Sequence, residues 1–210
     1  MSSNQKILNV PNILSFVRVL LVPVFVAVLL YMRDISIWGV IIPAVVYALT
    51  ALTDALDGNI ARKYGLVTDF GKFIDPLADK FMVLGSMIAI LAKTFLSIRT
   101  DNYGADLTFA IIFAWLFLIV LFRELAVTSM RLVVAGKKVK VDLAANIMGK
   151  LKTVSQMVGT IVIIVEPEIP FFSENHILSY VFMAVMAFTT VVSGWNYFKG
   201  YLPYIIGKGE

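Results

Sequence analysis

The chain has 210 residues, of which 60% are hydrophobic and 15% are charged, and its mean hydropathy is +0.88. Soluble domains carry about 45–50% apolar and roughly 25% charged residues. This composition excludes a disordered chain and argues against an ordinary soluble domain. Because the chain has no cysteine, disulfides, a thiolate nucleophile and cysteine-ligated metals are excluded too. The net charge of +4 fits a polytopic membrane protein whose basic residues face anionic headgroups.

Six stretches are apolar and long enough to cross a bilayer as helices, which takes about 20 residues each. They comprise residues 12–32, 37–57, 75–94, 107–130, 146–165 and 177–197. The first is too long for a signal peptide, and no small-residue cleavage site follows it. Residues 2–10 are expected to lie at the interface. The sequence therefore predicts an all-α fold of six transmembrane helices in one domain, residues 1–210.

Basic residues are distributed unequally between the two sets of loops and helix ends. If the N-terminus is inside, the outer side holds only Arg33, Lys93 and Arg99. The inner side holds twelve basic residues: Lys6, Arg62, Lys63, Lys72, Arg131, Lys137, Lys138, Lys140, Lys150, Lys152, Lys199 and Lys208. The positive-inside rule therefore predicts that both termini are cytoplasmic.

Four carboxylates occur where a membrane helix should avoid charge. Asp54 and Asp57 are three residues apart, and Asp75 and Asp79 are four apart, so each pair shares one helix face. An isolated carboxylate at membrane depth costs at least about 2.5–3.5 kcal/mol. Because a short loop joins the two helices, the pairs can converge, and cations must then neutralise them. Oxygen ligands without His or Cys favour Mg²⁺, Mn²⁺ or Ca²⁺.

Small and basic residues accompany these carboxylates. Gly58 and Ala61 lie on the Asp54 side of their helix and leave room for a ligand, while Arg62 can reach a phosphate. Gly71 allows the backbone to approach a ligand closely. Asp69 and Lys72 are interpreted instead as a pair that joins helix ends.

The spacing Asp54-x2-Asp57-Gly58-x2-Ala61-Arg62-x8-Gly71-x3-Asp75-x3-Asp79 resembles the signature of the CDP-alcohol phosphotransferase family at all eight positions. The resemblance implies a six-helix membrane enzyme, a homodimer in the plasma membrane, with two divalent cations (Mg²⁺ or Mn²⁺) at its cytoplasmic side. It also implies that Asp54, Asp57 and Asp75 ligate metal, and that Asp79 joins the second metal and is the general base. Gly58, Ala61, Arg62 and Gly71 would then line the CDP pocket, with Thr68 contributing.

The remaining motifs bear on the acceptor alcohol. The segments 9–18, 123–131 and 149–156 resemble the subgroup of that family that transfers the phosphatidyl group from CDP-diacylglycerol to glycerol 3-phosphate. Arg123, Arg131, Lys150 and Lys152 end spans four and five on the aspartate side, which suits a dianionic phosphate. Asn12 and Arg18 are assigned to the CDP-lipid side.

Other charged residues receive simpler interpretations. Lys137, Lys138 and Lys140 are read as positive-inside anchors, and Glu124 as the partner of a neighbouring arginine. His176 is interpreted as an isolated outer-loop residue without a catalytic role.

Two other functions remain open at this point. The first is the same chemistry with another acceptor, such as inositol phosphate or phosphatidylglycerol. The second is a metal or ion transporter, which would need polar groups continuing to the outer face, and inverted repeats or broken helices. The outer halves of the spans are almost wholly apolar, which favours a site closed from outside. Nucleic acid is not expected as a partner.

Overall fold

The computed structural model describes residues 9–32, 35, 37–64, 68–136, 147–169, 171–172 and 175–206, without the side chains of residues 11, 54–64 and 69. In this part of the chain the structure is helical, which confirms the all-α prediction. The elements are α1 (Val10–Tyr31), α2 (Trp38–Tyr64), α3 (Asp69–Leu96), α4 (Tyr103–Gly136), α5 (Ile147–Val165), the 3₁₀ helix η1 (Glu166–Glu168) and α6 (Ile177–Ile205).

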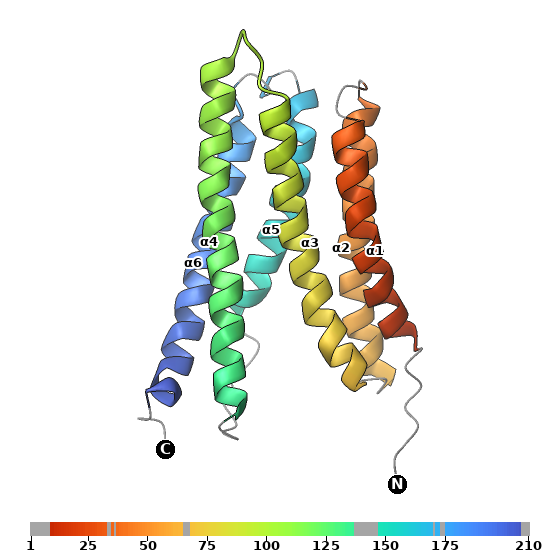
Figure 1. Cartoon of the computed structure of the whole chain (residues 1–210), viewed down its shortest axis with the longest axis vertical. Helices are drawn as coiled ribbons and strands as arrows, with labels where there is room; N and C mark the ends of the chain where they lie inside the picture. Colours follow the sequence, from red (N-terminus) through yellow and green to blue (C-terminus); the bar gives the residue numbers. More distant parts are fainter. Residues whose placement is uncertain are drawn as a thin grey trace.

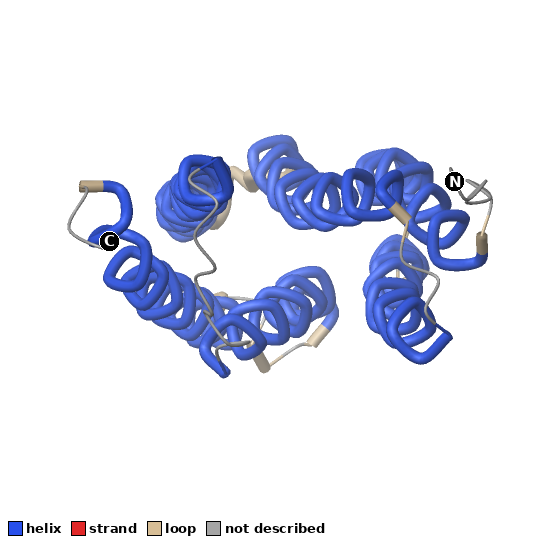
Figure 2. The backbone as a smooth tube through the Cα atoms, turned by 90° about the horizontal axis from the view of Figure 1, so that it is seen from below, coloured by secondary structure: helices blue, strands red, loops and turns tan. Residues whose placement is uncertain are grey.

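The helices run alternately up and down in one bundle (Figure 1). α1 packs against α2 and α3, while α6 packs against α4 and α5. The contacts of α3 with α4 and α5, and of α2 with α5, join the two groups. Figure 2 shows the bundle from one end. α1, α3 and α5 begin at the end of the bundle where α2, α4 and α6 finish, which we call the motif end.

Each helix overlaps one predicted span, but several extend farther at the motif end. α2 continues to Tyr64, α3 already begins at Asp69, and α4 continues to Gly136. The predicted spans already contain the four motif aspartates, and the helices extend beyond them to include the other motif positions, from Gly58 to Arg62 on α2 and Gly71 on α3. All eight positions of the motif therefore lie within α2 or α3.

Four helices in the described part of the chain are long and apolar enough to cross a membrane: α1, α4, α5 with η1, and α6. The apolar part of α2 is shorter, at Trp38–Thr53. In α3, charges such as Asp75, Asp79 and Lys93 interrupt the apolar sequence. Large apolar side chains also cover the outside, for example Trp115 and Phe122 of α4, which are 65% and 75% exposed. The protein is therefore an integral membrane protein.

The buried face of each helix changes character along the bundle. On α1, Val22, Phe25 and Leu29 are buried toward the middle and the far end, one turn apart, and Phe25 packs against Tyr47 of α2 with ring centroids 5.4 Å apart. At the motif end the same face of α1 instead buries the polar residues Asn12, Ser15 and Arg18. On α5, Lys152 and Gln156 likewise precede the apolar Ile163 and Ile164. The bundle thus has an apolar core and a polar interior at its motif end.

Candidate active site

The first turn of α3 is fixed to α1 by two buried polar side chains. Thr68 caps α3 by accepting a hydrogen bond from the backbone N–H of Gly71 at 3.0 Å. The side-chain amide of Asn12 donates to the same Thr68 oxygen at 2.9 Å, and the Thr68 hydroxyl lies 3.2 Å from the Asn12 amide oxygen. A Cβ on residue 71 would lie 2.7 Å from that oxygen, so any larger residue there would have to displace the Asn12 side chain. Three residues assigned to CDP-lipid binding therefore meet here, where they join two helices.

Asp75 and Asp79 lie one turn apart on α3 and both contact α1. The hydroxyl of Ser15 donates to Oδ1 of Asp75. Nη1 of Arg18 donates to Oδ1 of Asp79 at 2.7 Å. The side chain of Arg18 is wholly buried, whereas that of Asp79 is 54% exposed. Arg18, which was predicted to face the CDP lipid, is thus paired directly with the expected base, Asp79.

The other predicted metal ligands lie on α2. This helix is continuous through the motif and ends beside the start of α3 (Figure 1). A continuous helix puts positions 54 and 57 on one face, as expected. The structure describes only the backbone of five predicted site residues: Asp54, Asp57, Gly58, Ala61 and Arg62.

Two carboxylates of the expected metal site are described, Asp75 and Asp79. Among the described residues, no three His, Cys, Asp or Glu side chains form a group that could hold a metal. The donors available from α3 are carboxylate oxygens, which suit Mg²⁺ or Mn²⁺ rather than zinc or copper. The chemistry of these donors therefore fits the cations that the motif implies.

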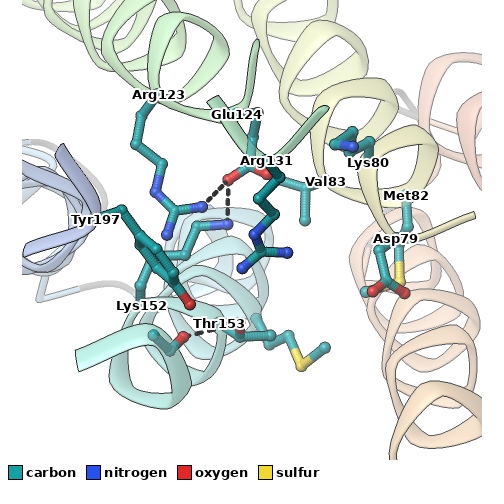
Figure 3. A pocket seen from close by; sticks show the side chains of 12 residues that line it. Asp79, Lys80, Met82, Val83, Arg123, Glu124, Arg131, Lys152, Thr153 and Tyr197 are labelled. Atoms are coloured by element: carbon teal, nitrogen blue, oxygen red, sulfur yellow. Dashed lines mark hydrogen bonds and ion pairs between the residues drawn. The ribbon is translucent and has the colours of Figure 1, made fainter. Parts of the chain in front are cut away.

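A second polar cluster lies on α4, α5 and α6 (Figure 3). Oε1 of Glu124 accepts from Nη1 of Arg123 at 2.9 Å and from Nζ of Lys152 at 2.5 Å. Nη2 of Arg123 donates to Oγ of Ser193 on α6 at 2.7 Å. Glu124 therefore pairs with two cations. Such pairing is expected, because ionised side chains inside a membrane protein are costly without partners of opposite charge. The predicted Glu124–arginine pair is confirmed, and Lys152 joins it.

Arg131 and Arg123 make different contacts within the protein. Its Cζ lies 5.0 Å from the ring centroid of Tyr197 on α6, and Cζ of Arg123 lies 5.4 Å from the same centroid. Within the described residues, Arg131 makes no hydrogen bond or ion pair. No described residue therefore occupies the guanidinium donors of Arg131, whereas those of Arg123 are engaged by Glu124 and Ser193.

A cavity of about 210 Å³ separates α3 from this cluster. Asp79 and Lys80 line it on the α3 side, and Arg123, Arg131 and Lys152 line it on the opposite side (Figure 3). Glu124 offsets one of those three cations, which leaves an excess of two positive charges. The cavity therefore places a carboxylate across from a site that suits a dianion.

Three of the four predicted phosphate-binding cations line the cavity, and the fourth does not. Lys150 is exposed on α5 and is absent from the cavity wall. Residues two apart on a helix point in different directions, so Lys150 and Lys152 cannot both face the cavity. The placement of Lys150 at the site is not supported by this geometry.

Two contact residues were missed by the sequence analysis. Ser15 is three residues from both Asn12 and Arg18, so the helical period of that buried face could have found it. Tyr197 carried no such signal, because an aromatic residue near the end of an apolar span resembles the interfacial belt of any membrane helix.

The remaining interpretations concern residues away from the cavity. His176 is not isolated: its Nε2 lies 3.3 Å from Oδ1 of Asp106, and its ring stacks on Phe109 with centroids 4.5 Å apart. It belongs to the end opposite the motif, where it joins α6 to α4. The predicted anchors Lys137, Lys138 and Lys140, and the side chain of Asp69, lie outside the described residues.

A helical membrane protein with carboxylates and a cation-lined cavity at one end has the features of an enzyme that handles phosphorylated substrates at the bilayer surface. Residues 8–194 match the family model described as CDP-alcohol phosphatidyltransferase. The chain belongs to this family of enzymes.

Relatives with the same reaction in their names are similar over most of the chain. A CDP-diacylglycerol–glycerol-3-phosphate 3-phosphatidyltransferase of Bacillus subtilis is 34% identical over 203 residues, covering 91% of this chain and 94% of the relative. One of the same name from Rickettsia typhi is 33% identical and covers 93% and 98%. A probable phosphatidylglycerophosphate synthase of Mycobacterium tuberculosis is 31% identical and covers 93% and 83%.

Proposed function

We propose that this enzyme transfers the phosphatidyl group from CDP-diacylglycerol to glycerol 3-phosphate, which gives phosphatidylglycerophosphate and CMP. The observation that carries the proposal is the cavity between Asp79 and the cations of α4 and α5. An acceptor that carries both a hydroxyl and a phosphate can span it, with the hydroxyl toward Asp79 and the phosphate toward Arg131. The names of the relatives support the same acceptor.

The proposed reaction exchanges one P–O bond for another. The acceptor hydroxyl attacks the phosphorus that bears the diacylglycerol, its proton passes to the Asp79 carboxylate, and the bond to CMP breaks. Arg131 binds the acceptor phosphate through donors that no described residue uses. Arg18 orients the Asp79 carboxylate through its ion pair, so that the base faces the cavity.

Two divalent cations, Mg²⁺ or Mn²⁺, complete the proposal. Asp54, Asp57, Asp75 and Asp79 would hold them, and Ser15 would orient Asp75. When bound, the cations neutralise charge that develops on the pyrophosphate and hold it for in-line displacement. Gly58, Ala61 and Arg62 are proposed to line the nucleotide pocket on α2, beside Gly71.

One alternative within the family is another acceptor, such as inositol phosphate or phosphatidylglycerol. Both also carry a phosphate, so the cavity does not discriminate strongly against them. The transporter alternative is disfavoured by the family match, which identifies an enzyme.

The decisive experiment is an acceptor panel. Purified protein in mixed micelles is given CDP-diacylglycerol, Mg²⁺ or Mn²⁺, and one of glycerol 3-phosphate, inositol phosphate, phosphatidylglycerol, glycerol or inositol, and CMP release is measured. We expect glycerol 3-phosphate to give the highest kcat/KM, and chelation of the metal to stop the reaction. A higher kcat/KM with any other member of the panel would overturn the acceptor assignment.

The membrane layout is part of the proposal. All six helices are proposed to cross the bilayer with both termini and the motif end in the cytoplasm, and the enzyme is proposed to be a homodimer. Because the chain lacks cysteine, single-cysteine labelling is clean. Cysteine at Gly136, which has open space around it, should be labelled only from inside, and cysteine at exposed Glu168 only from outside. Outside labelling at position 136 would overturn this orientation.

A further inference from the structure

Tyr197 is the one aromatic ring, among the described residues, that contacts both arginines of the cavity. Cζ of Arg131 lies 5.0 Å and Cζ of Arg123 5.4 Å from its centroid. The two arginines are eight residues apart on α4, which separates their Cα atoms by about 12 Å along the helix axis. Both guanidinium groups nevertheless lie against the same ring, which comes from another helix.

The ring is itself held in place. It stacks on Tyr201, one turn farther along α6, with centroids 6.1 Å apart and planes 12° apart. Its hydroxyl oxygen lies next to the start of α5, 3.5 Å from where a Cβ on Gly149 would be. That hydroxyl makes no hydrogen bond to any described residue, so the contact with the arginines depends on the ring face alone.

The two arginines depend on the ring to different degrees. Arg123 also has Glu124 and Ser193 as partners. Arg131 is exposed, and among the described residues it contacts the Tyr197 ring but makes no hydrogen bond or ion pair. Long cationic side chains at an exposed position lose rotamer entropy when they bind a ligand. A ring that restrains Arg131 beforehand reduces this cost.

We infer that Tyr197 is a positioning residue for the acceptor: its ring holds the Arg131 guanidinium toward the cavity, so that its donors meet the acceptor's phosphate. The inference rests on the proposed function and deepens it by naming a determinant of acceptor affinity on α6. Tyr197 acts through Arg131 and does not itself contact the reacting atoms.

The experiment measures steady-state kinetics for the full-length enzyme with glycerol 3-phosphate and with CDP-diacylglycerol varied in turn. Tyr197→Met removes the π face but keeps an apolar side chain against Tyr201. It should raise the KM for glycerol 3-phosphate about 3- to 10-fold, the range expected when one long side chain is no longer ordered before it binds the ligand. The KM for CDP-diacylglycerol and kcat should stay within about twofold, because those depend on the α2 and α3 side of the cavity.

Three further variants separate positioning from a purely structural role. Tyr197→Phe keeps the ring and should behave like the wild type. Trp195→Leu removes a different ring of α6, one that contacts Lys199 outside the cavity at 5.2 Å, and should change neither KM. In the Arg131→Ala background, Tyr197→Met should add less than about twofold, because coupled residues are not additive. If Tyr197→Met does not fold, Tyr197→Leu replaces it.

The inference is overturned if Tyr197→Met leaves the acceptor KM unchanged, if it raises both KM values equally, or if Tyr197→Phe is equally impaired. Full additivity with Arg131→Ala would also overturn it. A different result would contradict the proposed function without contradicting the role of Tyr197. If the wild type prefers inositol phosphate, the acceptor assignment is wrong, and a raised KM for inositol phosphate in Tyr197→Met would still support the role of Tyr197.

Discussion

The guanidinium of Arg18 lies 2.7 Å from the carboxylate of Asp79 and is wholly buried, although the carboxylate itself is half exposed to the cavity. A buried arginine in a membrane bundle needs an ionised partner. The proposed general base therefore also neutralises a charge inside the protein, so its substitution should affect both catalysis and stability.

We expect Asp79→Asn to lower turnover at least about 100-fold, the usual effect of losing a positioned base. The same substitution should destabilise the protein by roughly 1–3 kcal/mol, less than for a fully buried pair because the carboxylate is half exposed. CMP release and thermal unfolding in detergent measure the two effects.

A double substitution separates the two roles of Asp79. Adding Arg18→Met to Asp79→Asn removes the uncompensated charge, so it should recover stability without recovering turnover. Asp106→Asn, which breaks an ion pair with Arg99 at the opposite end, serves as the control and should leave turnover unchanged. If the double variant regains activity, Asp79 is not the base.

Ser15 donates a hydrogen bond to Asp75, and this contact should matter for metal affinity. Hydrogen bonds that orient metal ligands are commonly worth about 10- to 100-fold in affinity. Ser15→Ala should therefore raise the Mg²⁺ or Mn²⁺ concentration needed for half-maximal activity by about 10-fold. Thr94→Ala removes a hydroxyl of α3 that donates only to the backbone carbonyl of Ile90, and it should not shift the titration. Superimposable titrations of Ser15→Ala and wild type would contradict a metal at Asp75.

Gly71 is constrained by Asn12, whose amide oxygen would lie 2.7 Å from an added Cβ. Gly71→Ala should displace Asn12 from Thr68 and destabilise the protein by about 1–3 kcal/mol, as overpacking does. Because the two changes disturb one contact, Asn12→Ala combined with Gly71→Ala should cost less than the sum of the single changes. Gly104→Ala, with open space around it, is the matched control in the same unfolding measurement. A neutral Gly71→Ala would show that the contact between α1 and α3 adjusts freely.

The helical period predicted much of this site but not its assembly. It placed Asp75 and Asp79 on one face of α3, and the structure has both of them contacting α1. It did not foresee that Asn12 and Arg18 are used inside the protein, because a polar residue at the start of an apolar helix serves a ligand or a neighbouring helix equally well.

Convergence between distant helices was beyond what sequence spacing can predict. Topology alone placed Arg123 and Lys152 at the same end of the bundle, but it did not indicate that both contact Glu124 or that Tyr197 of α6 contacts Arg123, because those contacts depend on how the helices pack. Lys150 is the opposite case. Residues two apart do not share a helix face, so the spacing alone indicates that Lys150 and Lys152 point in different directions. The prediction grouped them because both are cations in one short segment.

Arg131 and Lys150 therefore provide the test that decides the acceptor. If Arg131 binds the phosphate of glycerol 3-phosphate, Arg131→Ala removes a charge-assisted contact worth roughly 1.5–3 kcal/mol and should raise the acceptor KM about 10- to 100-fold. The KM for CDP-diacylglycerol should barely change. Glycerol should be a poor acceptor for the wild type, and Arg131→Ala should discriminate less between glycerol and its phosphate. Lys150→Ala, which removes an exposed cation of α5 that is absent from the cavity wall, should change neither constant. If Arg131→Ala leaves both constants unchanged, as Lys150→Ala should, the cations of this end are only a topology signal and the acceptor assignment fails, whereas transfer chemistry based on the aspartates would still stand.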